Sequence, residues 1–168
     1  MKKLSLILAM TMALGLLVGC GAKEEAKDAA PKTETTAPAA TTEQQAAYKD
    51  GTYRAEGKEF DAKSGWKGTV EITVKGGKIE AVNWDAVHKD GGDTKKVQSQ
   101  DGRYDMVKGG ASAHWHEQAA SMEKALVEKQ DPAAIVLKED GKTDAVTGVS
   151  IHVSEFVQLA QEALESAK

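Results

Sequence analysis

Residues 21–47 contain no valine, isoleucine, leucine, methionine or aromatic side chain. This lack of large apolar side chains limits which part of the chain can form a hydrophobic core. Such a segment cannot bury enough apolar surface to offset the entropy lost on ordering, so it is expected to be a disordered tether. The 121 residues from Tyr48 to Lys168 are enough for one domain with one hydrophobic core. The sequence therefore predicts a single folded domain over residues 48–168.

The segment before the tether has the composition of an export signal. Lys2 and Lys3 precede a mostly apolar stretch, residues 4–18, that is short for a membrane-spanning helix. It ends in L-V-G-C at Cys20, which resembles the lipobox of bacterial lipoproteins, where the cysteine receives diacylglycerol. The resemblance implies a signal peptide over residues 1–19. It also implies an anchor to the lipid bilayer through Cys20, at the extracytoplasmic face of the bacterial cell membrane.

Charge and cysteine content argue against several classes of protein. The chain has 22 basic and 26 acidic side chains, and removal of residues 1–19 takes away two lysines and leaves a net charge of −6. That balance gives no electrostatic reason to bind nucleic acid. Cys20 is the only cysteine, so the mature protein is expected to have no disulfide and no cysteine-ligated iron–sulfur or haem group.

The first half of the folded part has the pattern of an antiparallel sheet. Residues 51–57 are typical of a short strand, and residues 68–84 of a hairpin in which Val70, Ile72 and Val74 share one face. Gly76-Gly77 supplies the tight turn. Residues 88–110 are rich in glycine, aspartate and lysine and are expected to form a long loop.

The second half has the pattern of helices. Residues 112–130 place Trp115, Ala119, Met122 and Leu126 on one helical face, and Asp131-Pro132 ends the helix. Residues 133–137 fit either a short buried strand or the start of another helix. A last amphipathic helix is expected from about Ser150 to the C-terminus. Together these elements predict an α+β domain, an antiparallel sheet with packed helices.

At the start of that helix, four residues form a pattern that can bind phosphate. Asp144, Thr147, Gly148 and Ser150 stand in the run D-A-V-T-G-V-S. Glycine permits close backbone approach, the hydroxyls donate hydrogen bonds, and the amides at a helix N-terminus attract anions. The residues alone leave a plainer alternative, that Ser150 is only the N-cap of the helix.

The same run resembles the flavinylation motif of FMN-binding domains, Asp-x-x-Ser/Thr-Gly-Ala-Thr. These domains occur in the C subunit of the sodium-pumping NADH:quinone reductase and in Gram-positive flavolipoproteins of extracellular electron transfer. Asp144, Thr147 and Gly148 match, Val149 replaces the usual alanine, and Ser150 takes the place of the accepting threonine. The resemblance extends from the YKDGTYRAEG opening through the hairpin to the last helix. It implies an FMN-binding-domain-like fold and FMN joined to Ser150 by an FAD:protein FMN transferase.

The resemblance also implies a function. The protein is expected to carry electrons from a membrane NADH or quinone dehydrogenase to external acceptors, with covalent FMN as its cofactor and no catalytic residue of its own. The alternative is a cofactor-free surface lipoprotein that binds a ligand or partner. In either case the signal peptide is also a candidate source of a peptide pheromone.

Other candidate residues are weighed against ordinary packing. His114 and His116 stand two positions apart and point away from each other if both lie on a helix, and no clear carboxylate completes a set, so no metal site is predicted. His152 is a candidate to contact a bound phosphate. The aromatic residues that are candidates to stack on a flavin ring, with Trp84 and Trp115 preferred, are Tyr53, Trp66, Trp84, Tyr104 and Trp115.

Overall fold

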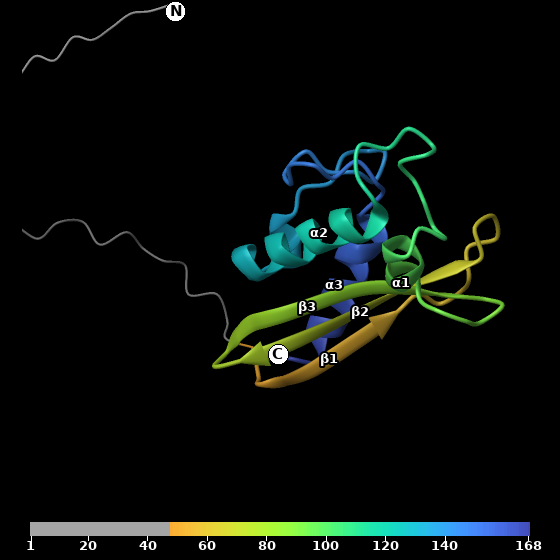
Figure 1. The fold of residues 1–168 in the computed structure, drawn as a ribbon. Coiled ribbons are helices and arrows are strands. Elements are labelled where there is room, and N and C mark those ends of the chain that lie inside the picture. The colour runs from red at the N-terminus through yellow and green to blue at the C-terminus, as the bar shows by residue number, and fades with distance from the viewer. Residues whose placement is uncertain (1–47) are drawn as a thin grey trace, which may run out of the picture. The chain divides into compact units, whose positions relative to one another are not determined.

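The computed structural model of the protein describes residues 48–168 (Figure 1). The predicted signal peptide, the predicted lipidation site at Cys20 and the predicted tether lie outside these described residues. Within residues 48–168, no helix is both long enough and apolar enough to cross a membrane.

Three strands form one antiparallel sheet in the order β1-β2-β3. They are β1 (Gly51–Glu56), β2 (Trp66–Lys75) and β3 (Lys78–His88). The predicted hairpin is confirmed, since Gly76 and Gly77 have φ of 60° and 74° and supply the left-handed backbone that a tight two-residue turn needs. The alternation is confirmed too, because Val70 and Ile72 are fully buried.

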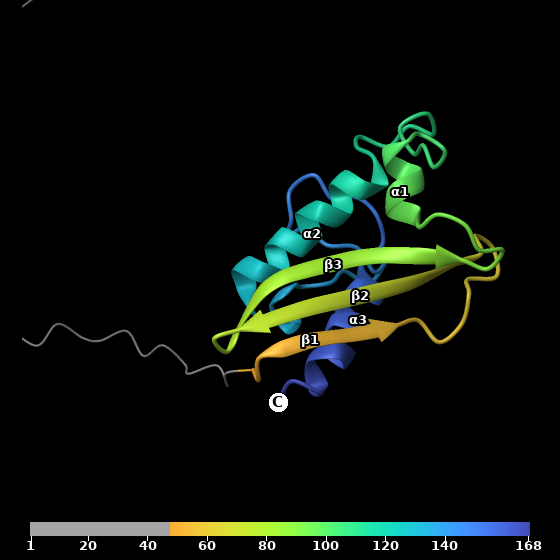
Figure 2. The ribbon, with the colours of Figure 1, turned by 60° about the horizontal axis from the view of Figure 1, so that its bottom comes forward.

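Two helices cover one face of this sheet. Helix α2 (Trp115–Lys129) packs on β3, and α3 (Ser154–Glu165) packs on β2 and β1. Figure 2 shows the strands in front and both helices behind them. The α+β architecture is therefore as predicted. The largest fully buried side chains in this core include Ile72, Met122, Leu126, Phe156 and Leu164.

Two segments differ from their predicted structure. The expected loop at 88–110 contains a short helix, α1 (Lys95–Gln100). Residues 133–137 form neither a strand nor an α-helix, so both options were wrong. A single 3-10 turn, η1 (Pro132–Ala134), begins there because Pro132 occupies its first position and the Asp131 carboxylate accepts the Ala133 N–H at 2.9 Å. Ile135 alone is then buried, while Val136 is 71% exposed.

Candidate functional site

The segment with the phosphate-binding pattern is a loop between η1 and α3 that lies against α2. Thr143, at its start, is buried, and its hydroxyl donates to the Val136 carbonyl at 2.7 Å. Gly148 has φ of 82°, a backbone conformation that favours glycine, so the chain turns sharply just before Ser150. The loop therefore has a defined path that ends at Ser150, an exposed residue.

Gln118 of α2 fastens this loop to the domain. Its amide oxygen accepts the Ser150 N–H at 2.8 Å, the Ile151 N–H at 3.2 Å and the Ser150 hydroxyl at 3.3 Å. Its amide nitrogen donates to the Ala113 carbonyl at 3.0 Å. Gln118 is only 1% exposed, and its amide oxygen holds the backbone of Ser150 and Ile151 in one place.

The expected helix start at Ser150 is wrong. Helix α3 begins at Ser154, with Val153 as its N-cap residue, and Ser150 lies four positions earlier. The amides of Val153 and Ser154 both donate to the Gly141 carbonyl, at 2.8 and 3.1 Å. Ser150 is therefore not the cap of this helix, and the helix amides do not converge on it.

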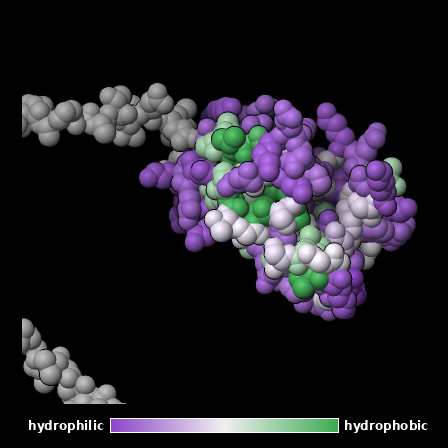
Figure 3. Space-filling model, turned by 90° about the horizontal axis from the view of Figure 1, so that it is seen from above, coloured by the Kyte–Doolittle hydropathy of each residue, from purple (hydrophilic) through white to green (hydrophobic). Residues whose placement is uncertain are grey.

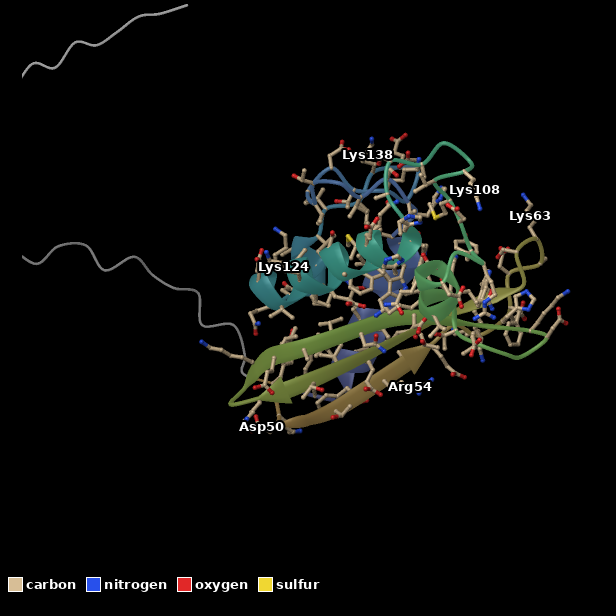
Figure 4. All side chains as sticks on the ribbon, in the orientation of Figure 1. Asp50, Arg54, Lys63, Lys108, Lys124 and Lys138 are labelled. Carbon is tan, nitrogen blue, oxygen red and sulfur yellow. The ribbon has the colours of Figure 1, made fainter. Side chains whose placement is uncertain are left out.

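The other residues of the pattern lie on the same loop but face different ways. Asp144 is exposed, and its carboxylate lies 3.4 Å from the Lys138 ammonium, which Figure 4 labels above the loop, rather than against Ser150. Thr147 is exposed and lines a groove between the loop and the outer side of α2. Thr147 and Gly148 thus lie in one turn directly before Ser150, and Asp144 is directed at solvent.

A cleft of about 420 Å³ opens beside Ser150, between the sheet, α1, α2 and α3. The two residues that follow Ser150, Ile151 and His152, form part of its wall. Its volume lies in the range of small-molecule and cofactor sites. From the helix side, hydrophobic residues form patches within a largely hydrophilic surface (Figure 3).

Four of the five candidate aromatic residues line this cleft. Trp84 and Trp115 are 4% exposed and meet edge to face with ring centroids 5.3 Å apart, so they form its floor. Trp66 and Tyr104 are half-buried and stand 6.1 Å apart, also edge to face. Tyr53 is not among the residues that line the cleft, and its hydroxyl donates to the carbonyl of Lys49, just before β1.

Sequence reasoning missed Lys95, the cationic side chain of the cleft. Its ammonium lies over three rings, 4.6 Å from the centroid of Tyr104, 5.1 Å from Trp115 and 5.7 Å from Trp66. We call these three rings the aromatic cage. Burial lowers the pKa of Lys95 to about 8, although the carboxylates of Glu155, Asp61 and Asp85 act in the opposite direction. A half-buried cation with a perturbed pKa in a cleft is a frequent mark of a functional site.

Helix α1 holds Lys95 in place through contacts with β3 and α2. The Asp85 carboxylate accepts the Lys96 N–H at 2.9 Å, and so satisfies a first-turn amide from outside the helix. The Lys96 ammonium lies 2.6 Å from the carboxylate of Glu123 on α2. The buried Ser99 hydroxyl lies 2.9 Å from Nδ1 of His116. These contacts fix a six-residue helix that could not form alone.

The two histidines of the A-H-W-H run do not point apart. Their rings are stacked, with centroids 5.5 Å apart, because His114 precedes α2 in an extended conformation and only His116 is helical. Within residues 48–168, no group of three or more potential ligands is arranged to hold a metal ion. His116 instead links α2 to α1 through Ser99.

Two carboxylates on the cleft wall are already hydrogen-bonded to backbone amides. Glu155 accepts the Gly68 N–H at 3.3 Å, and a Cβ at Gly68 would lie 2.7 Å from that carboxyl group, so glycine leaves it room. Asp61 accepts the Ser64 N–H at 2.6 Å, and this bond is the main reason why its pKa lies below the usual value. Both carboxylates are therefore engaged by backbone N–H groups, while the Lys95 ammonium lies over the rings.

Comparison with known proteins places this domain in a family. The chain is 35% identical over 120 residues to the 15 kDa lipoprotein of Treponema pallidum, across 71% of this chain and 76% of that protein. The chain belongs to the family of this lipoprotein. No model of a described protein family matches the sequence.

Two solved structures are similar to this member of the lipoprotein family. One is the solution NMR structure of a Clostridium thermocellum protein, at 56% identity and a TM-score of 0.56, over 71% of this chain and 92% of that one. The other is the crystal structure of a Clostridium perfringens protein, at 27% identity and a TM-score of 0.56, over 71% and 88%. The arrangement of sheet and helices is thus shared with proteins of known structure.

Proposed function

We propose that the protein is a lipid-anchored, extracytoplasmic electron carrier with FMN esterified to Ser150. The observation that carries the proposal is the position of Ser150, an exposed hydroxyl held by Gln118 next to a cleft of about 420 Å³ with aromatic walls. A planar isoalloxazine ring suits such walls, because flat aromatic surfaces stack well on one another. The relationship to a lipoprotein supports the anchor at Cys20.

Attachment requires a separate enzyme. The Ser150 oxygen attacks the phosphate of the FMN half of FAD, the pyrophosphate bond breaks, and AMP leaves with the proton. The partner of the Ser150 hydroxyl is the Gln118 amide oxygen, which does not take up a proton at neutral pH. The base must therefore come from the FAD:protein FMN transferase, and the exposed loop gives that enzyme access.

The roles of this chain are to hold, orient and shield the cofactor. Bound FMN supplies the capacity to accept and release electrons. The aromatic side chains Trp66, Tyr104 and Trp115 exclude water from one region of the cleft, and Ile151 continues that apolar wall next to the attachment point. Covalent attachment also prevents loss of the cofactor by dilution outside the cell. The electron donor proposed is a membrane NADH or quinone dehydrogenase, and the acceptors are external.

Mass spectrometry of the mature protein produced together with the transferase tests the attachment. We expect a gain of one FMN less one water in the wild type, and the same gain in Ser154→Ala, a matched loss of an exposed hydroxyl four residues away. Ser150→Ala should gain nothing. A gain that persists in Ser150→Ala, or that peptide mapping places on Thr147, would contradict the assignment.

A cofactor-free lipoprotein that uses the same cleft for a ligand is the second candidate. The caged Lys95 favours it as much as it favours FMN, because an acidic ligand would pair with that ammonium. It predicts a colourless protein, with no flavin absorption even when the transferase is present. The visible spectrum of the protein purified from its own cells separates the two functions.

A further inference from the structure

In the part of the chain that the structure describes, the Lys95 ammonium has no hydrogen-bond acceptor. Within residues 48–168, its ammonium forms neither a hydrogen bond nor an ion pair, and it lies over the three rings of the aromatic cage. Its neighbour Lys96 is the opposite case, because that ammonium donates to Asn83 and Glu123, both at 2.6 Å. An ammonium carries three N–H donors, and at Lys95, which lines the cleft, water or a bound group can accept them. Lys95 is therefore arranged for an acceptor that enters the cleft.

The charges around the cleft indicate which kind of ligand can accept hydrogen bonds from the Lys95 ammonium. Glu155 and Asp61 already accept backbone N–H groups and are held against the cleft wall. A ligand that brings its own negative charge gains from Lys95, and one that is neutral gains less. A ligand that becomes negative while it is bound therefore gains stability from Lys95 as it does so.

We propose that Lys95 sets the redox potential of the bound cofactor by stabilising the reduced, anionic flavin ring over the oxidised, neutral one. This inference rests on the proposed function. Reduction of FMN takes up two electrons and one proton and leaves a negative charge at the N1–C2 carbonyl edge of the ring. A positive charge beside a flavin ring is one of the means by which proteins tune its electronics. The electrons come from a membrane dehydrogenase in the cell and from dithionite in the experiment.

Potentiometric titration of the FMN-loaded mature protein tests the inference. A tenfold stronger preference for the reduced ring corresponds to about 30 mV for a two-electron couple. We expect Lys95→Met to lower the midpoint potential by at least this amount and Lys95→Arg to restore most of it. The control is Lys75→Met, which removes an exposed positive charge at the far end of β2. An unchanged potential in Lys95→Met, with FMN still attached, would overturn the inference.

A second measurement does not depend on the covalent bond. Riboflavin is titrated into apo-protein that carries Ser150→Ala, once oxidised and once reduced with dithionite. We expect reduced riboflavin to bind at least tenfold more tightly, and the added Lys95→Met change to abolish the difference. Equal binding of the two forms, or no binding of either, would refute the role of Lys95. Absence of a fluorescent flavin band from the denatured wild type refutes only the attachment at Ser150.

Discussion

Replacement of Gln118 by methionine tests how the Ser150 loop is held. Methionine has nearly the same volume and helix propensity as glutamine, so packing and the α2 backbone are little changed. The variant loses three bonds accepted by the amide oxygen and the one donated to Ala113. The Ser150 and Ile151 amides then have no acceptor unless the loop opens to water.

The expected cost follows from these bonds. Each hydrogen bond contributes about 1 kcal/mol net, and the 3.3 Å contact to the Ser150 hydroxyl contributes less. The more apolar methionine recovers about 1 kcal/mol through its burial. We therefore expect Gln118→Met to lower the free energy of unfolding by about 2 kcal/mol.

Urea denaturation measures this free energy, and amide hydrogen exchange shows where the change arises. The Ser150 and Ile151 amides should exchange faster in Gln118→Met, whereas the core amides of β2 should change only with global stability. The matched control is Gln158→Met, the same substitution at an exposed position of α3, with an expected change within about 0.5 kcal/mol. If the two loop amides stay as protected as in the wild type, Gln118 does not hold the loop.

Two further changes test the cleft. Folding lowers the pKa of Lys95 from 10.5 to about 8, so between these pH values the folded state binds fewer protons than the unfolded state. The free energy of unfolding therefore rises as the pH rises from 8 to 10.5. The full pKa shift corresponds to a free energy of about 3 kcal/mol, and the cation–π contacts offset part of it. In urea denaturation, the free energy of unfolding of the wild-type apo-protein should therefore rise by about 2 kcal/mol relative to Lys95→Met between pH 8 and pH 10.5. Gly68→Ala should cost about 1–2 kcal/mol, because its Cβ would lie 2.7 Å from the Glu155 carboxyl group. That cost should largely disappear in a Glu155→Ala background, and a cost unchanged there would show that the carboxylate is not what crowds position 68.

The sequence by itself determined the elements whose residues repeat at regular spacing. The alternation of Val70, Ile72 and Val74 determined the buried face of β2, and the stripe of Trp115, Met122 and Leu126 determined that of α2. These patterns are readable because strand and helix periods place every second or every third to fourth side chain on one side. The run that contains Ser150 was found from a motif of residues close together in the chain rather than from a period.

The tertiary structure decided what depends on contacts between distant residues. Helix α1 has too few residues for a period, and the carboxylate that completes its first turn comes from Asp85 on β3. Gln118 lies 32 positions from Ser150 and reads in the sequence as one more polar helix residue. Lys95 stands in a lysine pair of a glycine-rich segment, and only packing directs it at three rings from three parts of the chain. The environment of a side chain depends on which elements pack around it. The spacing of residues within one segment does not predict which distant elements those are.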